Sequence, residues 1–340
     1  MKALRIFWLF AIGSSLFACF GPGLGERGPR PYRTTVDLPE PVEAIGQGTE
    51  IVVCGLRYDI GTPVVLWTDP GGYDANSTRL HFAASTPGGT APADGELRYQ
   101  PGRVDRDTKI PLVRPSDSLD RLAGVVDQFV IHYDVCGTSR RCFKVLHDMR
   151  GLSVQFMLDL DGTIYQTLDL VHQAWHASQA NTRSIGIEIA NIGAYPAGDS
   201  ATLDQWYVET ARGAQVRIPL SRAGGGQRNA TASLQPRYPR RVHGRIHERD
   251  LVMYDLTTQQ YAALAKLSAK LCQLFPRIRP EVPRAADGRV LMGKMTPEAW
   301  RDFSGILGHF HLTTRKVDPG PAFAWEPYLQ EVRQIMRGPR

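Results

Sequence analysis

The chain has 340 residues, of which 42% are hydrophobic and 22% charged, a balance typical of a globular protein and not of a disordered one. Its 40 basic and 34 acidic side chains leave a net charge of +6, a mild excess that alone selects no partner. The sequence has no helix-turn-helix pattern, RNP-type aromatic motif or paired-cysteine finger, so nucleic acid is disfavoured as a partner.

The N-terminus has the pattern of a secretory signal. A basic head of five residues precedes an apolar run, Ile6 to Ala18, that is too short to span a membrane comfortably. Leu16, Ala18 and Cys19 resemble a bacterial lipobox, in which the cysteine becomes the lipidated first residue. We therefore expect residues 1–19 to be a signal peptide with Cys19 as the lipid anchor. This places the protein in the periplasm or cell envelope, with the membrane contacted only through the anchor.

The next segments are expected to lead into the main domain. Residues 20–43 are polar and Pro-rich, as in a flexible tether. Short β-like runs separated by turn clusters follow, for example at 50–54 and 62–67. We interpret residues 44–115 as a β-rich extension packed on the main domain.

Residues 116–335 form the expected main domain, with a Gly-, Arg- and Asn-rich insertion at about 195–250. Strands and helices alternate in it without a repeat, which predicts an α/β or α+β domain. Apolar runs predict strands at 128–131, 152–160, 163–166 and 184–191, and helical spacing predicts helices at 136–150 and 257–275.

Export bears on how the cysteines are interpreted. Cys136 and Cys142 are five residues apart, and in an oxidising compartment such a pair is more often a disulfide than a metal site. We predict a Cys136–Cys142 disulfide. Cys54 and Cys272 are either a long-range bridge or two buried thiols.

The stretch from Gly308 to Gly320 concentrates the chemistry. It contains His309, His311 and Asp318, and both imidazole and carboxylate are good zinc ligands. Pro319 and Gly320 present the carboxylate from a stiff turn. A catalytic zinc usually takes three protein ligands, and His132, at the end of an apolar strand, is the natural third.

Glu188 and Lys316 are the candidate catalytic side chains. Glu188 interrupts an isoleucine-rich strand, where a buried carboxylate is costly unless it is paired or used. We favour a general base for a metal-bound water, over an edge glutamate facing water or a structural pair with Arg183. Lys316 is a cation placed to stabilise a developing oxyanion.

Six pieces of the sequence, in one order, resemble the zinc-dependent N-acetylmuramoyl-L-alanine amidases of the peptidoglycan-recognition-protein superfamily. The pieces are 129–132 (FVIH), 152–154 (LSV), 161–166 (DGTIYQ), 174–177 (AWHA), 184–188 (SIGIE) and 315–320 (RKVDPG). The spacing of Cys136 and Cys142 is also similar to a small disulfide of secreted recognition proteins.

The resemblance implies a central mixed sheet flanked by helices, with a peptidoglycan groove and zinc on its floor. Its zinc ligands would be His132, His309 and Asp318. Its catalytic glutamate would be Glu188, and Lys316 its oxyanion-stabilising lysine. Trp175, His176 and Tyr133 would contact the muramyl-peptide. The implied reaction is hydrolysis of the amide between N-acetylmuramic acid and L-alanine.

Alternatives remain for one zinc ligand and for the function. His309 follows a glycine, as the ligand does in the superfamily, and is preferred to the competing His311. A non-catalytic recognition protein that holds muropeptides is the second functional hypothesis, and zinc hydrolysis of another amide or ester is the third. The presence of Asp318 together with Glu188 and Lys316 favours catalysis. Nothing in the sequence indicates an oligomer.

Overall fold

The computed structural model describes residues 48–82, 95–219 and 234–338. The expected signal peptide and tether lie outside these ranges, as does most of the Gly- and Asn-rich part of the insertion. Among the helices that fall inside them, none is both long and apolar enough to cross a membrane.

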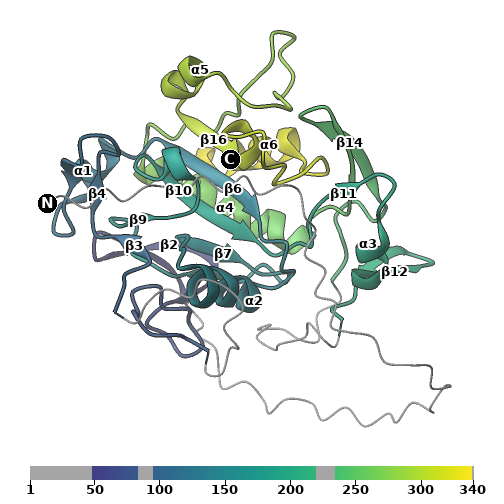
Figure 1. The fold of residues 1–340 in the computed structure, drawn as a ribbon, viewed down its shortest axis with the longest axis horizontal. Helices are drawn as coiled ribbons and strands as arrows, with labels where there is room; N and C mark the ends of the chain where they lie inside the picture. Colours follow the sequence, from purple (N-terminus) through teal and green to yellow (C-terminus); the bar gives the residue numbers. More distant parts are fainter. Residues whose placement is uncertain (1–47, 83–94, 220–233, 339–340) are drawn as a thin grey trace, which may run out of the picture. The chain divides into compact units, whose positions relative to one another are not determined.

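A mixed seven-stranded sheet organises the fold (Figure 1). Four neighbouring strands, β7, β10, β6 and β16, run parallel, whereas β1 with β2 and β7 with β8 pair antiparallel. In sheet order the strands are β1 (Gly48–Val53), β2 (Leu56–Leu66), β8 (Ile164–Gln166), β7 (Phe156–Leu158), β10 (Ser184–Ile189), β6 (Gln128–Tyr133) and β16 (Gly305–Gly308). The predicted fold class, a mixed α+β domain with a central sheet and N-terminal strands, is confirmed.

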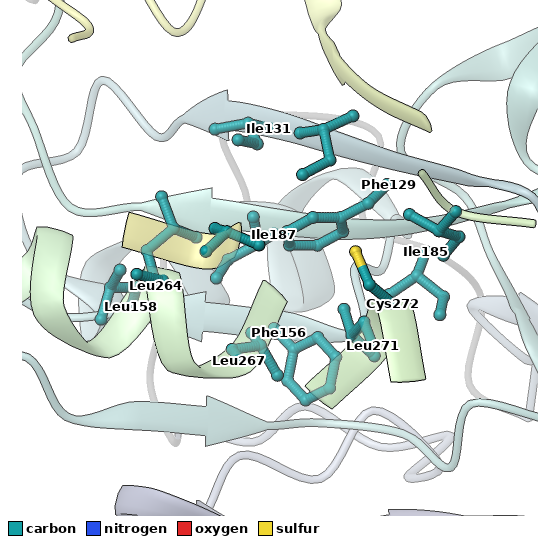
Figure 2. Packing of buried hydrophobic residues seen from close by; sticks show 14 of the residues in the cluster. Phe129, Ile131, Phe156, Leu158, Ile185, Ile187, Leu264, Leu267, Leu271 and Cys272 are labelled. Atoms are coloured by element: carbon teal, nitrogen blue, oxygen red, sulfur yellow. The ribbon is translucent and has the colours of Figure 1, made fainter. Parts of the chain in front are cut away.

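Helix α4 supplies the largest helical contribution to the core. Its N-terminus is fixed by a capping box, in which Thr257 Oγ1 accepts from Gln260 N and the Gln260 side chain accepts from Thr257 N. Figure 2 shows its leucines against aromatic and isoleucine side chains of the sheet. The helices are α1 (Leu119–Ala123), α2 (Ser139–Phe143), α3 (Ala201–Trp206), α4 (Thr258–Leu274), α5 (Pro297–Asp302) and α6 (Trp325–Arg337).

Smaller sheets surround the central one. The N-terminal strands are not separate from the main sheet, because β2 pairs in parallel with β8. The insertion forms two small antiparallel sheets of its own. The short strands are β3 (Tyr99–Gln100) with β9 (Gln173–Ala174), β4 (Arg103–Val104) with β5 (Pro111–Val113), β12 (Tyr207–Thr210) with β13 (Gly213–Val216), and β11 (Tyr195–Pro196), β15 (Arg249–Met253) and β14 (Val242–Ile246) in that order.

The helix predicted over 136–150 begins at Ser139 and changes from α-helical to π-helical winding at Lys144. It starts at α2, where Thr138 Oγ1 accepts from Arg141 N, and continues as a π-helical turn from Lys144 to Met149. Residues 152–155 precede β7 without strand pairing, because the paired part of the hairpin extends only to Phe156 and Gln166.

The predicted Cys136–Cys142 disulfide is not formed in the structure, where both residues are buried free thiols. The five-residue spacing does bring the two residues near each other, since both belong to one buried cluster and line one cavity wall. The difference therefore concerns their oxidation and not their position. Cys54 and Cys272 are also free, so the long-range bridge is not formed; of the two thiols Cys272 is buried and Cys54 is only partly buried.

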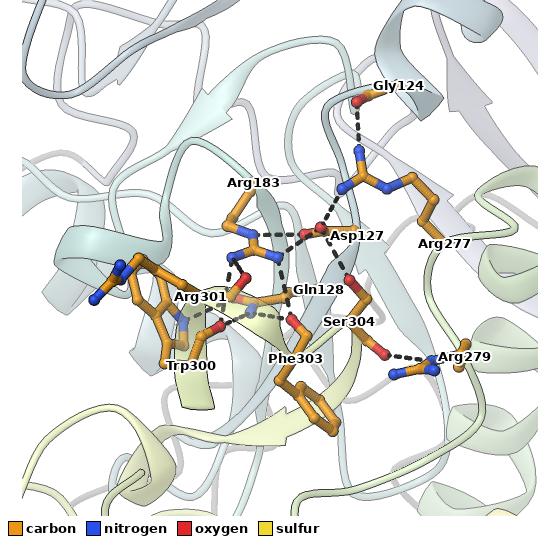
Figure 3. A network of polar contacts seen from close by, with 10 residues as sticks. All are labelled: Gly124, Asp127, Gln128, Arg183, Arg277, Arg279, Trp300, Arg301, Phe303 and Ser304. Carbon is orange, nitrogen blue, oxygen red and sulfur yellow. Dashed lines mark hydrogen bonds and ion pairs between the residues drawn. The ribbon is translucent and has the colours of Figure 1, made fainter. Parts of the chain in front are cut away.

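A buried carboxylate ties together the starts of three parallel strands (Figure 3). Asp127, directly before β6, accepts from the Arg183 guanidinium at 2.6 and 2.7 Å and from Arg277 at 2.7 Å. Ser304, directly before β16, donates to the same carboxylate at 3.1 Å. Arg183 is therefore the partner of Asp127 and does not pair with Glu188.

Replacing Asp127 with alanine is expected to lower the free energy of unfolding by about 3 kcal/mol, because Arg183 would keep its partly buried charge without a partner. Urea denaturation measures this change. The control is Glu298→Ala, which breaks the exposed pair with Arg301 and should leave the midpoint unchanged. Equal midpoints for the two variants would contradict the prediction.

Candidate metal centre and active site

The register of two parallel strands brings His132 and Glu188 together. The residues are direct partners between β6 and β10. Their neighbours Ile131 and Ile187 lie on the side of the sheet that faces α4 (Figure 2). Since side chains alternate along a strand, His132 and Glu188 project from the opposite face.

The next parallel strand carries the rest of the cluster. β16 pairs with β6 and ends at Gly308, so the following His309 emerges beside His132. A short 3₁₀ turn covers His309 to His311, and the chain returns so that Phe310 N donates to the carbonyl oxygen of Asp318 at 3.1 Å. The Asp318–Pro319 peptide bond is cis, and φ at Gly320 is +90°.

Three ligand-type atoms converge at this point. His132 Nδ1 lies 2.9 Å from His309 Nδ1 and 3.0 Å from Asp318 Oδ2, and His309 Nδ1 lies 3.0 Å from the same oxygen. In tetrahedral zinc sites with bonds of about 2.0 Å, ligand atoms are about 3.3 Å apart. The donor set and its spacing therefore fit a zinc ion with small side-chain adjustments.

The electrostatics of the cluster follow from its burial. Burial and the neighbouring His309 lower the pKa of His132 to about 4, so its imidazole is neutral at pH 7, as a ligand must be. Burial alone would raise the pKa of Asp318, but His309 and His132 hold it well below its ordinary value. The cluster thus offers two imidazoles and one carboxylate anion.

His311 points elsewhere. Its Nδ1 accepts from Gly308 N at 2.9 Å, and its Nε2 lies 2.8 Å from the carbonyl oxygen of Leu291. Both ring nitrogens are therefore used in holding the chain around β16. The structure brings His309, and not His311, next to His132 and Asp318.

Glu188 contributes an unsatisfied carboxylate beside this cluster. Its Oε2 is buried and has no hydrogen-bond partner among the described residues. Burial first, and then the nearby Asp318 and Asp134, raise the pKa of Glu188 well above its ordinary value, while Lys316 opposes the shift. A carboxyl group held in this way is suited to proton transfer.

These side chains line one cavity of about 150 Å³. Its walls also include Leu146, Arg150 and Leu152. The sequence-predicted site residues that line it are His132, Tyr133, Trp175, His176, Glu188, His309, Lys316 and Asp318. Cys136 and Cys142 lie in the same wall.

The insertion braces the loop that carries Lys316. At the tip of the β14–β15 hairpin, His247 Nε2 lies 3.1 Å from the carbonyl oxygen of Lys316, and Arg249 donates to the carbonyl oxygen of Thr314 at 3.1 Å. Lys316 itself is exposed and is one of the residues that line the cavity. The hairpin therefore fixes the backbone of the loop but not the ammonium group.

The three predicted substrate contacts differ in how they are placed. Trp175 is partly exposed in the cavity wall. Tyr133 also lines the cavity but is only 8% exposed, because it packs with Met253 and Ala322. His176 has both ring nitrogens next to protein atoms, Nδ1 at 3.0 Å from His132 Nε2 and Nε2 at 3.2 Å from Ser184 Oγ.

Sequence reasoning missed the role of Asp134. Its Oδ1 accepts from Cys136 N and Gly137 N at 2.9 Å and from Asn191 N at 3.2 Å, which fixes the loops after β6 and β10. The available signal was the Asp-x-Cys-Gly order directly after a strand, because aspartate commonly caps the backbone two and three residues on.

The fold and the site define a member of the type 2 amidase superfamily. A family model described as N-acetylmuramoyl-L-alanine amidase matches residues 122–321. The chain belongs to this family, as the resemblance in its sequence predicted. A search of curated proteins found none that matches.

Two solved structures are similar in part. A selenomethionine derivative of AmpD is 17% identical, covering 62% of this chain and 86% of that one, with a TM-score of 0.30. The N-acetylmuramyl-L-alanine amidase AmiD from E. coli, in complex with the substrate anhydro-N-acetylmuramic acid-L-Ala-D-gamma-Glu-L-Lys, is 16% identical. That match covers 68% of this chain and 65% of AmiD, with a TM-score of 0.34.

Proposed function

We propose that this protein is an exported zinc amidase that hydrolyses the amide between N-acetylmuramic acid and L-alanine in peptidoglycan. The observation that carries the proposal is the convergence of His132 Nδ1, His309 Nδ1 and Asp318 Oδ2 within about 3 Å of one another. Beside them lies Glu188 Oε2, which has no hydrogen-bond partner in the part of the chain that the structure describes. Membership of the amidase family supplies the reaction.

In this proposal the three converging side chains hold the metal. The chemistry that zinc supplies when bound is Lewis acidity, which polarises a carbonyl and lowers the pKa of water. Glu188 takes the proton from the attacking water as the new C–O bond forms. It then delivers the proton to the nitrogen of L-alanine as the C–N bond breaks. The Lys316 ammonium stabilises the negative charge that develops on the carbonyl oxygen.

Incubation of the purified protein with peptidoglycan tests the proposal. Free stem peptides are expected to be released by the zinc-loaded protein and not after treatment with a chelator. The absence of release from a zinc-loaded sample would contradict the amidase, and binding of muropeptides without release would favour the recognition protein. Release that survives complete removal of metal would contradict the zinc mechanism.

We also propose that residues 1–19 direct export and that Cys19 anchors the chain to the membrane, with 20–43 as tether. The basic head, the apolar run and the small residue before Cys19 support this. Export would place the enzyme in the same compartment as peptidoglycan, its proposed substrate. Cell fractionation tests the proposal, and accumulation of the full-length chain in the cytoplasmic fraction would contradict it.

A further inference from the structure

His176 lies directly behind one of the converging histidines. Its Nδ1 is 3.0 Å from His132 Nε2, the ring nitrogen opposite the one that faces His309 and Asp318. The two rings meet edge to face, with their centroids 5.2 Å apart and an interplanar angle of 87°. His132 is therefore held at both of its nitrogens.

The hydrogen-bond chain continues to a serine. His176 Nε2 lies 3.2 Å from Ser184 Oγ, at the start of β10. A histidine that binds metal through Nδ1 carries its proton on Nε2. His132 Nε2–H then donates to His176 Nδ1, which leaves the proton of His176 on Nε2, where it is donated to Ser184 Oγ. One set of tautomers therefore gives every hydrogen bond from His132 through His176 to Ser184 a donor and an acceptor.

The sequence makes room for this ring. A Cβ atom at Gly186 would lie 2.5 Å from His176 Nδ1, closer than real contacts allow. The backbone at Gly186 is not in the left-handed region, so the glycine is required there for space and not for conformation. The small residue in the middle of β10 thus allows His176 to lie against the sheet beside His132.

The loop that carries His176 is also fixed. Asn181 Oδ1 accepts from His176 N and Ala177 N at 3.2 and 2.6 Å. The fully buried guanidinium of Arg103, on β4, donates to the carbonyl oxygens of Asn181 and Ser184 at 3.1 and 2.8 Å. Arg103 lies outside the segment that matches the amidase family. The β-rich extension therefore stabilises the support behind the metal ligands.

We propose that His176 is a positioning residue that holds His132 in the tautomer and orientation that present Nδ1 to the metal, with Ser184 and Gly186 as its supports. This replaces the substrate contact predicted for His176, because neither of its ring nitrogens is free for a ligand. Outer partners of this kind raise metal affinity by fixing ligand orientation. The inference rests on the proposed zinc site.

A pair of variants with similar shapes tests the proposal. In His176→Asn the amide oxygen can take the place of Nδ1 and accept from His132, whereas His176→Leu offers no acceptor. Competition with a chromogenic chelator should show a loss of zinc affinity of about 10- to 100-fold for His176→Leu and near-wild-type affinity for His176→Asn. Gly186→Ala, which displaces the His176 ring without removing it, should also weaken zinc binding, as His176→Leu does.

NMR of the zinc-loaded protein gives a readout independent of turnover. The Nε2–H proton of His132 should be observed and protected from exchange in wild type and His176→Asn, and lost in His176→Leu. Thermal unfolding of each variant separates loss of fold from loss of affinity. Equal zinc affinity in the Leu and Asn variants would overturn the role of His176 alone. A wild-type protein that binds no zinc would overturn the proposed function as well.

Discussion

Replacing Asp318 with alanine is expected to abolish zinc retention and amide hydrolysis together. Asp318 Oδ2 is the only carboxylate oxygen in the described cluster and lies 3.0 Å from both imidazole nitrogens. Outer-shell partners of a metal are worth about 10- to 100-fold in affinity, so loss of a direct ligand should exceed about 100-fold. Elemental analysis after dialysis and the rate of stem-peptide release measure the two effects.

The matched control for this prediction is His311→Gln. A glutamine can still accept from Gly308 N and donate to the carbonyl oxygen of Leu291, the two contacts that His311 makes. This variant should keep stoichiometric zinc, with some loss of stability. Zinc that is kept by Asp318→Ala and lost by His311→Gln would contradict the ligand assignment and restore His311 as the competing ligand.

Much of the fold was predictable because its signals are local. Apolar runs marked β6 and β10, and helical spacing with a terminating proline marked α4 within one residue at each end. The strand positions also carried site information. A histidine directly after Ile131 and a glutamate directly after Ile187 become partners only because the two strands pair in that register.

Features that depend on long-range contacts were less predictable. The pairing of β2 with β8, which joins the extension to the central sheet, has no local signature. The same holds for the Arg183–Asp127 pair, since Arg183 could equally have been assigned to Glu188 from the sequence. His176 was predicted to contact substrate, and its place in the cavity wall agrees with its motif. The direction of its ring, on which the proposed positioning role rests, has no signal in the sequence.

Replacing Glu188 with glutamine is expected to remove hydrolysis while leaving zinc bound. Glutamine keeps the shape of the side chain but cannot accept the proton of the attacking water, and general acid–base groups contribute about 10²- to 10⁴-fold to rate. Glu188 does not belong to the cluster of converging ligand atoms, so zinc stoichiometry should stay at the wild-type value. Stem-peptide release and elemental analysis measure the two quantities.

The Glu188→Gln variant should lose activity without losing stability. Glu188 Oε2 is buried without a partner in the described part of the chain, and burial raises the pKa of this carboxyl because its charged form is poorly solvated. A neutral amide avoids that cost, so the metal-free Glu188→Gln variant should melt at or above the wild-type temperature. Glu188→Asp is the control, since it keeps a proton acceptor and should retain more activity than the glutamine variant. A glutamine variant with near-wild-type turnover would exclude Glu188 as the proton-transfer group. The other two carboxylates among the described residues of the cavity wall already have roles, since Asp318 belongs to the ligand cluster and Asp134 accepts from backbone N–H groups.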